Sequence, residues 1–196
     1  MGTLKSLLLL IVLATSTVSF SNDIVLISDL DDTIKITETN RPLMTIYRGL
    51  FSKKVFAGMP ELYEHMQHLY VDKTVILSNS PKVLKGPVNR LIKKHNIEVD
   101  QLILRSLKTD KDKFKYKFNN IVAQLSGNAK KAILIGDDSG EDHEIYTAVK
   151  AAHPDRVLAI YIRPVKGRHL PAGINKYITA FDIALSFESE IPSVLS

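Results

Sequence analysis

Five short apolar runs, each followed by a polar residue, constrain the fold of this chain most strongly. They span residues 24–28, 74–77, 102–104, 132–135 and 157–162. Unbroken apolar runs of this length are typical of strands covered on both faces, as in parallel sheets. Apolar residues at helical spacing fill the intervals and predict helices over residues 60–70, 83–95, 115–125 and 142–152. The alternation of strands and helices predicts an α/β fold with a doubly wound parallel sheet.

The two ends of the chain follow other patterns. Residues 1–21 open with a cation at Lys5, continue with an apolar run over 7–13 and finish with small and hydroxyl side chains. This order is typical of a secretory signal peptide, and the run is shorter than the ~20 residues of a membrane-spanning helix. We therefore expect cleavage between Ser19 and Asn22, a catalytic domain over residues 22–196, and a secreted or periplasmic location. Near the C-terminus, residues 177–181 predict a last short strand, and Asp182 is placed to cap a closing helix.

Polar side chains gather where three of the predicted strands end. They are Asp29, Asp31 and Thr33 after the first strand, Ser78 and Asn79 after the second, and Asp137 and Asp142 after the fourth. Ligands of open α/β sheets bind beyond the carboxyl ends of the strands. Taken singly, an acidic cluster can be a solvated turn, and Ser-Asn-Ser-Pro can be an ordinary helix cap. Their shared edge favours one functional site.

These residue types fit phosphoryl transfer. One carboxylate of Asp29 and Asp31 can attack phosphorus while the other handles protons. The Ser78 hydroxyl can hold phosphoryl oxygens, and Asp137 can ligate Mg²⁺, which prefers oxygen ligands. The absence of cysteine excludes a thiolate metal site. So many negative charges also require a cation, for which the candidates are Lys111, Lys113, Lys115 and Lys117.

In this order on the strand ends, the groups resemble the haloacid dehalogenase superfamily, over roughly residues 24–163. The resemblance implies that Asp29 forms an aspartyl-phosphate and that Asp31 protonates the leaving oxygen and then activates water. Thr33 would support the loop, and Ser78 with Asn79 would bind the phosphoryl group. Mg²⁺ would be held by Asp29, Asp31 through its carbonyl, and Asp137, with Asp142 close behind. An aspartate at position 31 fits phosphatases rather than dehalogenases.

The flanking residues resemble a narrower family, the actin-patch-type phosphatidate phosphatases. The similar segments are 27–35, 58–63, 77–81, 102–105, 134–146 and 156–163. In that family a lysine stands four residues before an isoleucine, which selects Lys117 ahead of Ile121. Asp138 and His143 depart from the family pattern, where a small residue and a proline are usual. Neither departure removes a catalytic group, but both could change metal or substrate preference.

The spacing and charge of the chain indicate the class of substrate. Only 44 residues separate Thr33 from Ser78, which leaves room for a minimal cap or flap rather than a closing lid domain. An open site favours a large substrate that seals the cleft itself, such as a lipid headgroup. The stretch from Lys82 to Lys117 holds eleven Lys and Arg against four Asp and Glu. This excess indicates either a solvated helix face or a surface that contacts anionic membranes.

The preferred hypothesis is therefore a Mg²⁺-dependent phosphatase acting on phosphatidate, with Lys85, Lys93 and Lys94 beside the site mouth contacting the membrane. One alternative is a broad-specificity secreted acid phosphatase. Another is an inactive phosphate- or lipid-binding module, which the complete set of catalytic groups disfavours. The aromatic residues are not interleaved with the basic ones, so we expect no nucleic-acid partner.

Overall fold

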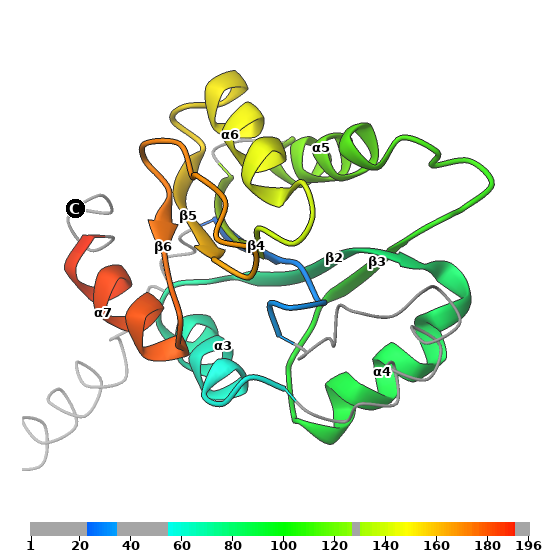
Figure 1. Cartoon of the computed structure of the whole chain (residues 1–196). Helices are drawn as coiled ribbons and strands as arrows, with labels where there is room; N and C mark the ends of the chain where they lie inside the picture. Colours follow the sequence, from blue (N-terminus) through cyan, green and yellow to red (C-terminus); the bar gives the residue numbers. More distant parts are fainter. Residues whose placement is uncertain (1–22, 35–54, 127–129, 191–196) are drawn as a thin grey trace, which may run out of the picture.

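The computed structural model of the chain describes residues 23–34, 55–126 and 130–190. Its strands are β1 (Ile24–Ser28), β2 (Lys73–Pro81), β3 (Gln101–Arg105), β4 (Lys131–Asp137), β5 (Val157–Arg163) and β6 (Asn175–Lys176). Its helices are α3 (Met59–Leu69), the short 3₁₀ helix η1 (Lys82–Leu84), α4 (Lys85–Lys94), α5 (Lys113–Leu125), α6 (Asp142–Ala152) and α7 (Ala180–Glu190). All neighbouring strands pair in parallel, in the order β3-β2-β1-β4-β5-β6 (Figure 1). The predicted α/β fold with a doubly wound parallel sheet is confirmed.

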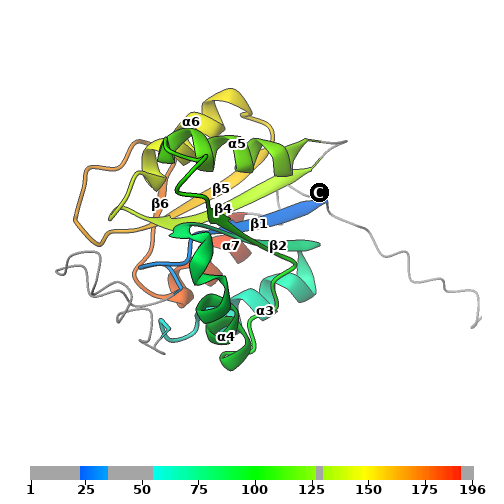
Figure 2. The ribbon, with the colours of Figure 1, turned by 90° about the vertical axis from the view of Figure 1, so that its right-hand side faces the viewer.

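Helices cover both faces of the sheet, which explains why its central strands are apolar over most of their length. Helices α5 and α6 lie on one face, and α3, α4 and α7 lie on the other (Figures 1 and 2). Alternate residues of one strand therefore enter different cores. Ile24 and Leu26 pack with the α3, α4 and α7 side, whereas Val25 and Ile27 pack with the α5 and α6 side.

The strand order puts β1 and β4 in the middle of the sheet. Successive connections run outward from β1 to β2 and β3, and then outward on the other side from β4 to β5 and β6. The place where the order reverses lies between β1 and β4, and such a switch point opens a crevice at the carboxyl edge. Asp29 follows β1 and Asp137 ends β4, so both acidic residues flank this crevice.

Two local predictions differ from the structure. Strand β2 continues to Pro81 instead of ending at Leu77, with an irregular register between Ser78 and Pro81. The last strand is Asn175–Lys176 rather than 177–181, because the chain turns after Tyr177 into α7. The capping prediction for Asp182 is confirmed: Thr179 N donates to Asp182 Oδ2 at 2.8 Å, and Asp182 N donates to Thr179 Oγ1 at 3.4 Å.

Two predictions fall outside the described residues. One is the signal peptide over 1–21, and the other is the flap between Thr33 and Ser78, of which residues 35–54 are not described. Within the described ranges, no helix has both the length and the apolar character needed to cross a membrane.

Candidate active site

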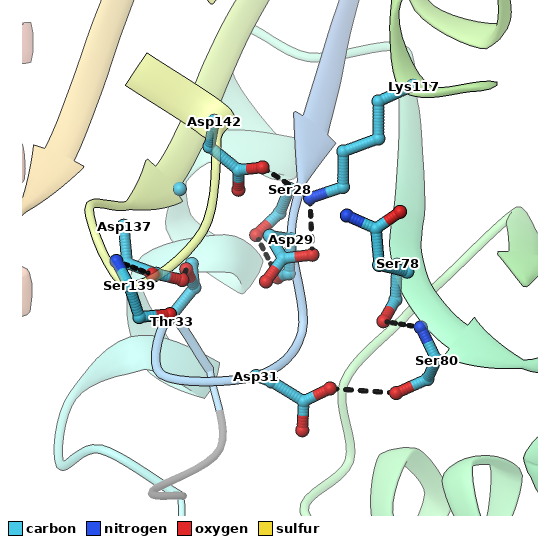
Figure 3. A network of polar contacts seen from close by, with 12 residues as sticks. Ser28, Asp29, Asp31, Thr33, Ser78, Ser80, Lys117, Asp137, Ser139 and Asp142 are labelled. Carbon is cyan, nitrogen blue, oxygen red and sulfur yellow. Dashed lines mark hydrogen bonds and ion pairs between the residues drawn. The ribbon is translucent and has the colours of Figure 1, made fainter. Parts of the chain in front are cut away.

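A buried lysine between two aspartates forms the centre of the site. Lys117 Nζ donates to Asp29 Oδ1 at 2.7 Å and to Asp142 Oδ1 at 2.6 Å (Figure 3). The three side chains come from α5, from the residue after β1 and from the first residue of α6, and all are buried. Lys117 therefore joins the two halves of the sheet at the switch point. Lys111, Lys113 and Lys115 are exposed, so helix α5 directs Lys117 alone among the four candidates to Asp29.

Asp137 completes an acidic cluster with Asp29 and Asp142. One carboxylate oxygen from each residue lies within 4.8 Å of the other two. Asp137 is itself held by Ser139 N, which donates to Oδ1 at 2.6 Å, and by Thr33 Oγ1, which donates to Oδ2 at 3.3 Å. The structure thus places Thr33 as a support for a carboxylate rather than as a group that faces the cleft.

The acidic cluster fits a divalent metal ion. Asp29, Asp137 and Asp142 supply three negative charges against the single positive charge of Lys117, so two negative charges are left unbalanced. Asp142 Oδ2 is buried and has no hydrogen-bond partner among the described residues. Burying a carboxylate oxygen without a partner is costly, and a hard cation such as Mg²⁺ would remove that cost. Asp29, Asp137 and Asp142 are therefore the residues that could hold Mg²⁺.

Burial and mutual repulsion also shift the acidity of these groups. Burial, reinforced by Asp142, raises the pKa of Asp137 to about 6, although hydrogen bonds from Ser139 partly oppose the shift. Burial also raises the pKa of Asp29, against the lowering effect of Lys117. The pKa of Lys117 is raised because its two carboxylate partners outweigh its own desolvation. Lys117 therefore stays charged at neutral pH, whereas Asp29 and Asp137 hold their protons to higher pH than free aspartates do.

Gly136 allows this close packing. A Cβ atom at position 136 would lie 2.7 Å from Asp142 Oδ2 and 2.9 Å from Tyr146 Cε2. Both distances are below van der Waals contact, and α6 carries both neighbouring residues. A side chain at position 136 would therefore push Asp142 away from Lys117.

Asp31 points away from the acidic cluster. Ser80 Oγ donates to Asp31 Oδ2 at 2.8 Å, and Asp31 is partly exposed at the cleft (Figure 3). Alternation along β2 places Ser78 and Ser80 on the same side of that strand, and both are buried. Asp29 and Asp31 thus have separate environments, one beside a lysine and one beside a hydroxyl. Such separation suits a nucleophile and an acid–base group.

Ser78 is oriented by its own strand. Its Oγ accepts a hydrogen bond from Ser80 N at 3.0 Å, so its hydroxyl proton remains available to a phosphoryl oxygen. Its carbonyl accepts from Tyr116 Oη at 3.2 Å, which links β2 to α5. The next residue, Asn79, lines the cleft, and its buried Oδ1 has no hydrogen-bond partner in the described part of the chain.

The cleft has a volume of about 440 Å³ and lies at the carboxyl edge of the sheet. It is lined by Asp29, Asp31, Ser78, Asn79, Lys113, Lys117, Asp137, Ser139, Gly140, Glu141, Asp142, Glu144 and Arg168. Seven of the eight site residues predicted from the sequence meet there, and the exception, Thr33, supports the site through its contact with Asp137. Lys113 and Arg168 add cations that the sequence analysis did not select.

Further supporting residues were also missed. Tyr63 Oη lies 2.5 Å from Ser28 Oγ, and Ser28 Oγ donates to Asp29 O at 2.7 Å. Helix α3 therefore supports the backbone at Asp29. The Arg163 guanidinium lies between the rings of Phe56 and Tyr177, at 3.7 and 4.5 Å from their centroids. It also donates to the Thr33 carbonyl at 3.5 Å. The pattern of apolar and polar residues in the sequence predicts none of these contacts, because each depends on tertiary packing.

Asp138, which departs from the family pattern, has a structural role. Asp138 is buried, and its carboxylate accepts hydrogen bonds from Val165 N, Lys166 N and Arg168 N at 2.5–2.8 Å. Burial opposes its ionisation, but these three backbone donors prevail and lower the pKa of Asp138. The carboxylate therefore fixes the loop that carries Arg168 into the cleft. His143 is buried in the first turn of α6, and its Nδ1 has no partner among the described atoms.

The lysines of α4 that were predicted to contact the membrane are arranged differently from the prediction. Helix α4 begins beside the end of β2 and returns toward the start of that strand, where Asp100 N donates to Thr74 O. Lys93 and Lys94 lie in the last turn of α4, whereas Lys85 is its first residue. Lys93 and Lys94 therefore lie toward the opposite edge of the sheet from the cleft, and placing them at the cleft mouth was wrong.

Comparison with known proteins bears on the family to which the chain belongs. Residues 24–164 match the family described as phosphatidate phosphatase APP1, catalytic domain. The chain is 31% identical over 155 residues to phosphatidate phosphatase APP1 of Saccharomyces cerevisiae, covering 70% of this chain and 25% of the yeast protein. It is 27% identical over 156 residues to uncharacterized protein C29B5.04c of Schizosaccharomyces pombe, covering 74% and 26%. The chain thus spans about a quarter of the length of these curated relatives.

Among solved structures, a Pnkp1/Rnl/Hen1 complex is similar over 63% of this chain and 41% of its own, at a TM-score of 0.49 and 18% identity. The family match covers all five predicted carboxylates and hydroxyls that line the cleft, from Asp29 through Asp142. The family resemblance expected from the sequence is confirmed, and the chain belongs to the family of APP1-type phosphatidate phosphatase catalytic domains.

Proposed function

We propose that this protein is a Mg²⁺-dependent phosphomonoester hydrolase that dephosphorylates phosphatidate through an aspartyl-phosphate on Asp29. The observation that carries the proposal is the Asp29–Lys117–Asp142 bridge beside Asp137, at the switch point of the sheet. Family membership supports a phosphatase, and the yeast relative is named as a phosphatidate phosphatase.

In the proposed first step, an Asp29 carboxylate oxygen attacks phosphorus and the bond from phosphorus to the ester oxygen breaks. Asp31, oriented by Ser80, gives its proton to the departing alkoxide. Ser78 and Asn79 bind phosphoryl oxygens, and Lys117 balances charge next to the nucleophile. When bound at Asp29, Asp137 and Asp142, Mg²⁺ would neutralise charge that develops on the phosphoryl oxygens.

In the second step, water attacks the phosphorus of the aspartyl-phosphate. Asp31, now ionised, accepts the proton of that water, and the bond from phosphorus to Asp29 breaks. Inorganic phosphate leaves and both carboxylates return to their first state. Asp31 has to donate a proton in the first step and accept one in the second, and its partly exposed position at the cleft permits both transfers.

A phosphate-release screen tests the proposal. Purified protein should hydrolyse phosphatidate in vesicles with Mg²⁺ and lose activity in EDTA. Preference for soluble monoesters over phosphatidate would instead favour a broad-specificity acid phosphatase. No release from any monoester would leave a phosphate- or lipid-binding module.

We also propose that the protein is exported, as the pattern of residues 1–21 indicates. Mass spectrometry of secreted or periplasmic material should find an N-terminus between Phe20 and Asp23. Recovery of soluble cytoplasmic protein that retains Met1 would refute export.

A further inference from the structure

Most of the exposed large apolar side chains of the described residues lie at the edge of the sheet that holds the cleft. Seven large apolar side chains are exposed in the described part of the chain. Five of them lie just beyond the carboxyl ends of strands, and we call them the apolar rim: Val83, Leu107, Val165, Ile178 and Phe181. Their exposed fractions run from 38% for Val165 to 74% for Val83.

The apolar rim has a regular relation to the sheet. Four members are the second residue after a strand, since β2, β3, β5 and β6 end at Pro81, Arg105, Arg163 and Lys176. The fifth, Phe181, lies in the first turn of α7. Because the strands are parallel, all four strand ends open on the edge that holds Asp29 and Asp137. Figure 2 shows the orange connection from β5 to β6, which carries Val165, projecting from the left side of the molecule.

The segments that carry the rim are ordered by hydrogen bonds, so the exposure does not come from frayed chain. Three backbone N–H groups of the Val165 loop bind Asp138. Ser106 N, beside Leu107, donates to Asp110 Oδ2 at 2.8 Å. Ile178 N donates to Asp182 Oδ2 at 2.9 Å. The backbone is therefore fixed at these positions, and apolar side chains that gather at one edge of a fold, unlike scattered ones, can mark a contact surface.

Exposed lysines accompany the rim. Lys82 and Lys85 flank Val83, Lys108 follows Leu107, Lys166 follows Val165, and Lys176 precedes Ile178. Lys113 and Arg168 continue this positive charge into the cleft lining. Alternation of apolar side chains with cations suits an anionic lipid surface, because the apolar groups enter the interface while the cations meet the phosphates.

We propose that the apolar rim and its lysines form an interfacial surface that seats the cleft mouth on an anionic bilayer. This inference rests on the proposed function, since it supplies the route by which a membrane phospholipid reaches Asp29. The rim lies at the same edge of the sheet as the cleft, so docking would bring the opening to the bilayer and limit the entry of bulk water.

The test separates binding from catalysis. The probe is vesicles of phosphatidylcholine with or without phosphatidylserine, which is anionic but carries no phosphomonoester. We expect the whole protein to co-sediment with the phosphatidylserine vesicles and to bind them less well in high salt. The double variant Leu107→Ser/Ile178→Ser should bind at least about tenfold more weakly, since two exposed apolar groups no longer enter the interface. Its hydrolysis of a soluble phosphate should stay unchanged.

Matched control variants make the same substitutions at positions outside the apolar rim. Leu69→Ser/Leu185→Ser alters the two exposed apolar residues outside the rim and should bind like wild type. Lys82→Gln/Lys108→Gln should weaken binding at low salt, whereas Lys93→Gln/Lys94→Gln, in the last turn of α4, should not.

Equal binding by the rim variant and its control would overturn the inference. Absence of wild-type binding to anionic vesicles would also overturn it, and a protein partner would then be the occupant to seek. Hydrolysis of phosphatidate by the same protein would still support the proposed function. Conversely, rim-dependent vesicle binding without hydrolysis of phosphatidate would support the surface and refute the proposed substrate.

Discussion

Replacing Asp137 by asparagine should stabilise the metal-free protein while destroying its response to Mg²⁺. The side chain is 2% exposed, and its pKa is raised from 3.8 to about 6, by burial first and by Asp142 next. The folded protein thus holds this proton to higher pH than the unfolded chain does. The contribution of Asp137 to stability is therefore present below pH 3.8 and is lost as the pH rises through about 6.

The magnitude follows from the same values. Each pKa unit corresponds to ~1.4 kcal/mol, so the shift of Asp137 is worth ~3 kcal/mol above pH 6. Asparagine has nearly the same shape and can still accept from Ser139 N, but that hydrogen bond loses its charge assistance. We therefore expect the free energy of unfolding to rise by ~2 kcal/mol near pH 8 and by almost nothing near pH 4.

Urea denaturation in EDTA at the two pH values measures this difference. Asp155→Asn, at an exposed position after α6, controls for loss of one negative charge. Added Mg²⁺ should raise the stability of wild type and of the control but not of Asp137→Asn. If Asp137→Asn lowers stability near pH 8 in EDTA, the carboxylate is not held under repulsion, and the argument for a cation at this cluster fails.

Three further variants test the supports of the site. Gly136→Ala should lower kcat at least about tenfold in a protein that circular dichroism shows to be folded, because the new Cβ meets Asp142 Oδ2 at 2.7 Å; wild-type turnover would mean that the Lys117 bridge tolerates displacement. Ser80→Ala should reduce kcat by about tenfold with KM little changed, because Asp31 loses its orienting hydroxyl; a change confined to KM would assign Ser80 to binding instead. Tyr63→Phe should lower the free energy of unfolding by ~1–2 kcal/mol, through loss of the buried 2.5 Å contact with Ser28, and should leave most of the activity; unchanged stability would contradict that role.

The sheet and its acidic edge could be predicted from sequence because their signals are local and strong. Ile24–Ser28 is apolar up to its last residue and buried at every position because helices cover both faces, and parallel strands bring their ends to one edge. That logic was enough to bring Asp29, Ser78 and Asp137 together. It could not select Lys117 from its neighbours, for which the family resemblance was needed.

Other contacts could not be predicted because they depend on how distant elements pack. Arg163 looked like a strand terminator, yet it lies between Phe56 and Tyr177 and contacts the Thr33 carbonyl. The course of α4 also depends on the sheet, so sequence proximity wrongly placed Lys94 beside the cleft. The error at 177–181 has a similar origin, because Tyr177 is buried by tertiary contacts while Ile178 turns outward.

Covalent capture of the phosphorylated enzyme tests the central claim most directly. Protein turning over phosphatidate with Mg²⁺ is quenched in acid, reduced with borohydride and digested, and the peptide that contains Asp29 is sequenced by mass spectrometry. An acyl phosphate is reduced to an alcohol, whereas a free carboxylate is not, so residue 29 should appear as homoserine only in samples quenched during turnover. The Asp29→Asn variant should show no such product and no phosphate release. Active enzyme with unmodified Asp29, or with the reduced residue at another position, would contradict the account.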